Sequence, residues 1–168
     1  MFLYSRNNKY LMLARTHFAF GILTGVLLID FFQFSSIAQY IVYFLIIHLA
    51  VLLPDCDHPE SSINKRVKVT KVLTFFVSHR GILHSIFPPI IFSILLYYYA
   101  NYFIAGAFFI GYFSHLLSDA LTVNGINFLY PLINFKISGP IRTGHLSEKI
   151  IFWAVVIGII LRIYYLVF

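Results

Sequence analysis

The sequence predicts an all-α protein: a polytopic helical membrane protein with about five transmembrane helices and a cytoplasmic N-terminus. Hydrophobic residues make up 60% of the 168 residues, against ~45–50% in soluble domains. Charged residues make up only 11%, less than half the usual ~25%, so a soluble fold could not cover its surface with them. The apolar residues also gather into long runs. This composition excludes a disordered chain, and the length fits a single domain, residues 1–168.

Five apolar runs are expected to form the helices, because a spanning helix needs about 20 apolar residues, with ~17–25 the usual range. The runs are Phe18–Phe32, Ile37–Leu53, Ile82–Ala100, Tyr102–Leu121 and Ile150–Phe168. The last three have a suitable length. The first two are shorter, so they are expected to extend into flanking residues or to tilt little. Pro88 and Pro89 predict a kink in the third helix.

The basic residues indicate the orientation in the cell membrane. Eleven of the twelve Lys and Arg residues precede the first run, or lie between the second and third or the fourth and fifth, and only Arg162 does not. By the positive-inside rule this side is the cytoplasm. The net charge of +6 suits an anionic membrane surface. An alternative for the first run is a cleaved signal peptide, with Ser36-Ile37-Ala38 as a weak cleavage site.

Two polar segments of the expected cytoplasmic side are long enough to have structure of their own. Ser61–Val77 mixes basic and apolar residues, which fits either an amphipathic interfacial helix or a solvated basic loop. Thr122–Glu148 is rich in Gly and Pro and predicts a long loop. Its apolar content favours a docked or partly re-entrant segment. Cys56 is the only cysteine, so no intrachain disulfide forms.

Histidine and acidic residues gather at the cytoplasmic ends of the expected helices. Six of the seven histidines, and every Asp except Asp30, lie there, whereas unrelated interfacial histidines would fall on both membrane faces. Ionisable groups at this depth are costly and tend to be functional. Imidazole with carboxylate is the ligand set of zinc, manganese or iron. The pattern therefore predicts a site for one to three divalent metal ions, with zinc favoured. His48 is expected instead to pack between helices.

Single motifs in this layer each have a simpler explanation as well. His115 and Asp119 lie four residues apart on one helix face, which suits either a shared ion or a hydrogen-bonded pair at a helix end. Asp55 and Asp57 follow Pro54, where acidic residues are common in turns. The two histidines His79 and His84 reach one ion only if the chain bends between them. The metal site is predicted from their combination.

Four segments of the chain together resemble a known family. They are Arg15–His17 (RTH), Leu53–Pro59 (LPDCDHP), His79–Ser85 (HRGILHS) and Gly111–Asp119 (GYFSHLLSD). They resemble the YdjM-like family, described as membrane-bound, predicted metal-dependent hydrolases that are under LexA control in some bacteria. The resemblance runs from His17 to Pro131. Cys56 stands where an aliphatic residue is common, and Leu83 where Thr is common.

The YdjM-like family is thought to be distantly similar to zinc-dependent phospholipase C and to single-strand nucleases of that fold. This resemblance implies a helical metal cluster and phosphoester chemistry, although fold analogy alone is a weak warrant for function. The residue types and the resemblance together predict eight metal ligands: His17, Asp55, Asp57, His58, His79, His84, His115 and Asp119. Arg80 is expected to clamp a phosphate. Arg142 is expected to contact phosphate as well, and Glu148 to act as a general base or an additional ligand. The two arginines could equally attract lipid headgroups.

The expected function is an integral membrane hydrolase that cleaves a lipid phosphodiester or pyrophosphate at the cytoplasmic membrane face. Its expected partners are membrane lipid and a phospholipid substrate, with nucleic acid a weaker alternative because no basic groove interleaved with aromatic residues is evident. Two other classes remain open, a metal transporter and a non-catalytic membrane protein stabilised by its metal. A transporter would hold its ligands near the bilayer midplane.

Overall fold

The computed structural model describes residues 14–57 and 81–168. Within these residues the α-helices are α1 (Ala14–Leu27), α2 (Ile37–Leu52), α4 (Phe87–Tyr99), α5 (Tyr102–Ala120) and α6 (Leu146–Val167). Short 3-10 turns are η1 (Ile29–Phe31), η2 (Pro54–Asp57) and η3 (Ile82–His84), and β1 (Ile126–Asn127) pairs antiparallel with β2 (Lys136–Ile137). The all-α prediction is confirmed.

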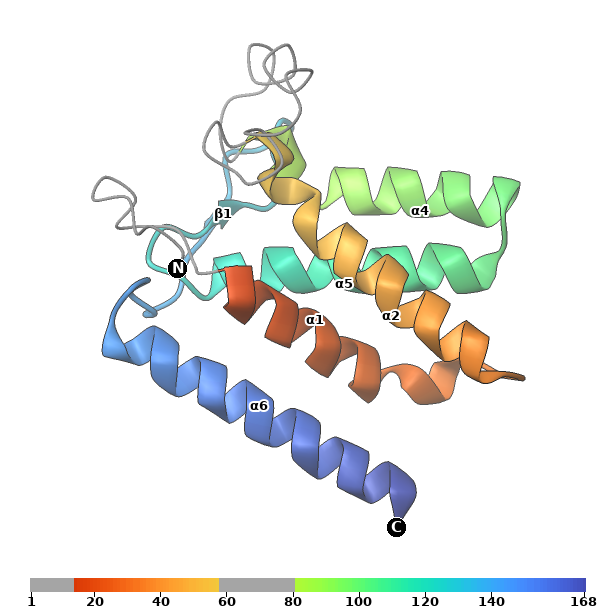
Figure 1. The fold of residues 1–168 in the computed structure, drawn as a ribbon. Coiled ribbons are helices and arrows are strands. Elements are labelled where there is room, and N and C mark those ends of the chain that lie inside the picture. The colour runs from red at the N-terminus through yellow and green to blue at the C-terminus, as the bar shows by residue number, and fades with distance from the viewer. Residues whose placement is uncertain (1–13, 58–80) are drawn as a thin grey trace.

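Helix α5 lies at the centre of the bundle and contacts α1, α2 and α4, while α6 packs mainly against α1 (Figure 1). Tyr43 and Ile47 of α2 pack with Ala107 of α5 in a buried apolar cluster. Close approach of these two helices requires Gly111, because a Cβ there would overlap the carbonyl oxygen of Ile47. The backbones of α2 and α5 are therefore in direct contact just before the segment that bears His115.

Two of the described helices, α5 and α6, are long and apolar enough to cross a membrane by length and composition. Their surroundings differ, since α5 is more than half buried in the bundle, whereas few residues of α6 are fully buried. Large side chains such as Trp153 and Leu161 cover the outside of α6, as on a helix that faces lipid. Helices α2 and α4 are apolar but shorter. The arrangement with five spans stays a prediction.

The structure corrects several helix boundaries. The first run divides into α1 and the separate turn η1. The predicted kink at Pro88 and Pro89 is wrong, because both residues lie in the first turn of α4, where a missing amide hydrogen breaks no intrahelical bond. The residues before them form η3 and leave the helix axis. The last helix begins at Leu146 rather than Ile150.

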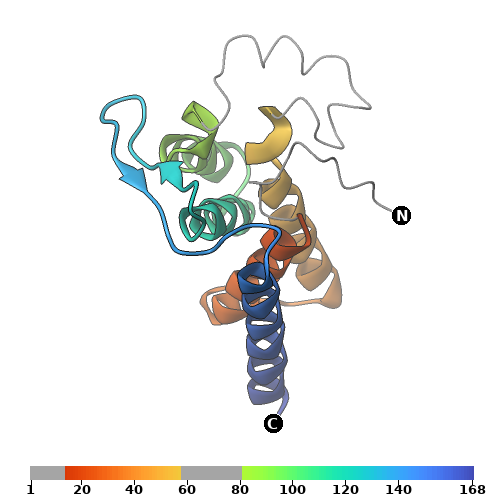
Figure 2. The same ribbon diagram turned by 90° about the vertical axis from the view of Figure 1, so that its left-hand side faces the viewer.

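The segment between α5 and α6 contacts the bundle through β1, whereas Leu132, Ile133 and Phe135, part of the apolar content that predicted docking, are exposed. Ile126 of β1 is buried with Ala50, Tyr112 and Leu116. Seen from this end of the bundle, the strand pair lies beside the end of α5 (Figure 2). The segment Ser61–Val77, expected as an amphipathic helix or a solvated basic loop, lies outside the described residues.

Arg162, the one basic residue that departs from the positive-inside pattern, has partners. It forms an ion pair with Asp30 of η1 and also donates to the carbonyl oxygen of Val26. Its guanidinium carbon lies 5.5 Å from the centre of the Tyr165 ring. These contacts offset the cost of a charge within an apolar helix and hold α6 to the end of α1.

Candidate metal centre

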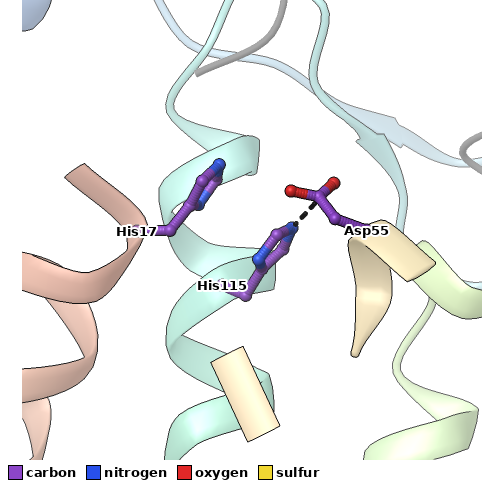
Figure 3. A group of neighbouring side chains, drawn as sticks. All are labelled: His17, Asp55 and His115. Atoms are coloured by element: carbon purple, nitrogen blue, oxygen red, sulfur yellow. Dashed lines mark ion pairs between the residues drawn. The ribbon is translucent and has the colours of Figure 1, made fainter. Parts of the chain in front are cut away.

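Four separate elements bring polar side chains to one end of the bundle. His115 and Asp119 lie one turn apart on the last turns of α5, so they share a face as predicted. His17 comes from α1, Asp55 from η2 and His84 from η3. Figure 3 shows the rings of His17 and His115 beside each other, with the Asp55 carboxylate facing His115. These two rings stack with their centres 4.0 Å apart.

The nitrogen and oxygen atoms of this cluster are too far apart for hydrogen bonds but close enough to share an ion. The Nε2 atom of His84 is 3.7 Å from Asp55 Oδ1 and 3.6 Å from Asp119 Oδ2. The Nε2 atom of His115 is 3.7 Å from Asp55 Oδ1 and 3.9 Å from Asp119 Oδ2. Asp119 Oδ1 instead faces His17, whose Nε2 is 3.7 Å away. Asp119 thus presents one oxygen to each of two histidine groups.

The hydrogen bond of His115 fixes which nitrogen can bind a cation. Its Nδ1 lies 2.8 Å from the carbonyl oxygen of Val51, and a carbonyl can only accept, so Nδ1 carries the proton. In the neutral ring the lone pair is then on Nε2. This atom has no hydrogen-bond partner among the described residues. It faces the two carboxylates.

His17 has the same tautomer, for a different reason. Its Nδ1 lies 2.6 Å from the hydroxyl oxygen of Ser118. That hydroxyl donates its only hydrogen to the carbonyl oxygen of His115, 2.8 Å away. Ser118 must therefore accept the hydrogen from His17, which leaves the His17 lone pair on Nε2. Two imidazole lone pairs point at two carboxylates.

Such an electron-rich cluster fits a divalent cation. For ligand bonds of ~2.0–2.1 Å, the edges of a regular tetrahedron are about 3.3–3.4 Å. The four nitrogen–oxygen distances among His84, His115, Asp55 and Asp119 are 3.6–3.9 Å, a few tenths of an ångström longer than such edges, and His84, His115 and Asp119 form one possible ligand group. His17, Asp55 and His115 form a second possible ligand group. His115 belongs to both groups but has one lone pair for one ion.

The cluster is buried on all sides except at Asp55. His17, His84, His115 and Asp119 are each at most 3% exposed, whereas the Asp55 side chain is 33% exposed. Burial raises the pKa of the Asp55 carboxyl. The His84 imidazole beside it and the nearby rings of His115 and His17 more than reverse this effect and hold the pKa of Asp55 well below its usual range. Asp55 is therefore a carboxylate at neutral pH.

Several residues that hold the ligands were missed in the sequence. Ser118 and the Val51 carbonyl orient the two imidazoles, as described above. Tyr112 donates from its hydroxyl to the carbonyl oxygen of Leu83, 2.8 Å away, and so fixes η3, which bears His84. Tyr112 and Ser118 lie three residues before and after His115. This helical spacing was a readable signal that they share the face of the ligand.

Other predicted site residues are placed elsewhere or are not described. Glu148 accepts from the Thr16 hydroxyl at 3.1 Å and from the Gly144 amide at 2.6 Å, and it belongs to neither ligand group. Arg142 lines a separate cavity. His58, His79 and Arg80 lie outside the described residues, as does the side chain of Asp57. His48 of α2 stacks on Phe18 of α1, so it packs between two helices as expected, although its side chain is exposed.

A model of the family described as "YdjM inner membrane protein" matches residues 12–168. The chain belongs to this family. It is 36% identical over 92 residues to the inner membrane protein YdjM of Escherichia coli, and equally to that of Shigella flexneri. It is 35% identical over 106 residues to the uncharacterized protein YvsG of Bacillus subtilis.

These alignments are partial. The alignment with YdjM covers 49% of the chain and 46% of the relative, and the alignment with YvsG covers 61% and 66%. No solved structure matches the chain. The family description and the apolar helices together support a membrane location, and the resemblance to the YdjM-like family predicted from four short segments is confirmed.

Proposed function

We propose that this member of the YdjM family is a metal-dependent hydrolase of the cell membrane. It cleaves a phosphoester, either a lipid phosphodiester or a lipid pyrophosphate, at the cytoplasmic face of a bundle with five spans. One observation carries the proposal: the imidazole lone pairs of His17 and His115 point at the carboxylates of Asp55 and Asp119 in a buried layer. Without a cation these groups would repel one another.

Zinc is the ion that this ligand set fits best, because imidazole and carboxylate at tetrahedral spacing are typical of its sites. When bound, such an ion supplies the positive charge that activates water and stabilises charge on a phosphoryl oxygen. The chain itself holds the ligands at fixed positions. Asp119, with one oxygen toward each histidine group, is suited to bridge two ions.

The exposure of Asp55 distinguishes a catalytic site from a structural one. Catalytic zinc keeps one position open to water or substrate, whereas structural zinc is enclosed by protein ligands. Here one ligand reaches the surface, while the other described ligands are buried. The ligands also lie at one end of the helices, which is the level of the lipid phosphates in the proposed orientation across the membrane. A transport site would lie near the middle of the membrane.

The proposal is tested by measuring metal content in the detergent-purified protein and in the variants Asp119→Asn and His84→Ala. The matched control is His48→Ala, which removes an exposed histidine outside the ligand groups. We expect one or more zinc ions per chain in the parent and the control, and loss in both ligand variants. Hydrolysis of phospholipid and of a chromogenic phosphodiester should be present in the proteins that retain zinc and lost in those that do not.

Full activity in both purified ligand variants would refute the assignment of the site. Bound metal without turnover of any phosphodiester or pyrophosphate would refute the hydrolase and favour a metal that stabilises the bundle. Absence of metal after reloading of folded protein would refute both. Folding of each variant is checked by gel filtration and helical circular dichroism before these comparisons.

A further inference from the structure

A second polar feature lies next to the ligand layer, where α5 ends and α6 begins. It is a cavity of about 230 Å³ lined by residues 122–124, by residues 141–143 and by His145. Ligand sites for drug-sized molecules are usually ~300–1,000 Å³, so this cavity suits a small group. None of its lining residues belongs to the described metal-ligand groups.

The lining is suited to an anion. Arg142 supplies a permanent positive charge and five hydrogen-bond donors in a planar fork, and His145, Asn124 and Thr143 add polar side chains. None of the described residues that line the cavity carries a carboxylate. His145 is the residue before α6, so the cavity also borders the positive end of the dipole of that helix.

The cavity walls are held in place by backbone hydrogen bonds. The Val123 amide donates to the carbonyl oxygen of Ile141, and the Ile141 amide donates to that of Leu121. Gly139 fits against this junction because a Cβ there would overlap the backbone of Leu121. A ligand would therefore meet preformed walls and lose little affinity to loop ordering.

Two short connections join the cavity to the ligand layer. Thr122, a lining residue, donates from its hydroxyl to the carbonyl oxygen of Asp119, 2.8 Å away. On the other wall, Gly144 donates to Glu148, which also accepts from Thr16, the neighbour of His17. These bonds tie the cavity walls to the segments that bear Asp119 and His17.

We infer that this cavity binds a phosphate group, as the part of the substrate that is recognised but not cleaved. The inference rests on the proposed function for the reacting group, whereas binding of the anion itself requires no metal. A phosphate in the cavity would accept a bidentate pair of hydrogen bonds from Arg142. A site that recognises a second phosphate group favours lipid pyrophosphates and phosphorylated lipids as substrates over neutral esters.

Binding is tested on the metal-stripped full chain in detergent by titration calorimetry, so that neither turnover nor a bound ion contributes. The probes are inorganic phosphate and dihexanoyl phosphatidic acid. The variant is Arg142→Gln, and the matched control is Lys149→Gln, a loss of the same charge from an exposed residue of α6 that does not line the cavity. Arg142 is exposed as well, so both variants are expected to fold.

We expect Arg142→Gln to weaken binding about 10- to 100-fold, the usual effect of losing hydrogen bonds to a charged group, and Lys149→Gln to change it less than twofold. Equal losses in both variants would overturn the site and leave only general attraction to a basic face. Absence of binding to the parent would overturn it too. If phosphatidic acid binds more tightly than inorganic phosphate, the site recognises a lipid headgroup. If inorganic phosphate binds more tightly, the site recognises free phosphate. Hydrolysis by a protein that binds neither probe would preserve the proposed function alone.

Discussion

Replacing Ser118 by alanine tests the inferred tautomer of His17 without touching a ligand. The Ser118 hydroxyl accepts the hydrogen of His17 Nδ1 and donates its own to the His115 carbonyl oxygen. Ser118→Ala removes the acceptor in a fully buried place. The His17 ring must then keep a buried hydrogen without a partner or move its proton to Nε2, the atom that would bind the ion.

Both outcomes weaken metal binding by a similar amount. An unsatisfied buried donor costs about 1–3 kcal/mol. Loss of the hydrogen bond that orients a histidine ligand typically lowers metal affinity 10- to 100-fold, which corresponds to about 1.4–2.8 kcal/mol. We therefore expect a zinc dissociation constant 10 to 100 times higher in Ser118→Ala, with the same number of ions bound at saturation.

The affinity is measured by competition with a chromophoric chelator, and the tautomer of His17 by ¹⁵N chemical shifts. Ser114→Ala is the control, because Ser114 is equally buried on α5 but bonds only to the Gly111 carbonyl of its own helix. Zinc affinity should be unchanged in this control. Equal affinity in both variants, or a parent His17 with the proton on Nε2, would refute the reasoning about the tautomer.

Two further substitutions and one titration test the packing around the site. Gly111→Ala places a Cβ against the Ile47 backbone and should destabilise the protein by about 1–3 kcal/mol. Gly158→Ala is the control, because its Cβ meets only ordinary contacts. Equal melting temperatures of the two variants would contradict this packing. Glu148→Gln leaves one acceptor oxygen where Thr16 and a backbone amide now use two, so thermal unfolding should show a loss of about 1–3 kcal/mol with zinc content retained. Zinc at 1,000 times its dissociation constant should add about 4 kcal/mol to the unfolding free energy, and an unchanged midpoint would mean that no folded-state site exists.

The helical class and the gathering of the ligands could be predicted because both follow from local sequence. An apolar run has to be buried or face lipid, and His115 and Asp119 share a helix face whatever surrounds them. The prediction about Pro88 and Pro89 failed because proline has the same local preference at a kink and in a first turn. The choice depends on whether the preceding residues continue the helix, and η3, held by Tyr112, does not.

The roles of supporting residues depended on distant contacts. Glu148 was expected at the metal because it is acidic and close in sequence to His145. In the structure it accepts hydrogen bonds from Thr16, 132 residues away in sequence, and from Gly144, a pairing that no local pattern encodes. The role of the Val51 carbonyl could not be predicted for another reason. Every residue has a backbone carbonyl, and only the packing of α2 against α5 places this one beside His115.

The spread of the ligands along the chain also has a consequence for biogenesis. His17 lies on the first described helix, and its partner Ser118 is 101 residues later in the sequence, with Asp119 next to it. A ribosome therefore releases the start of the site long before its end, and the cluster can close only after α5 has been synthesised. At the proposed metal site, binding of an ion would then be a late step that follows synthesis of α5, and an incomplete nascent chain would lack the ligands that α5 bears.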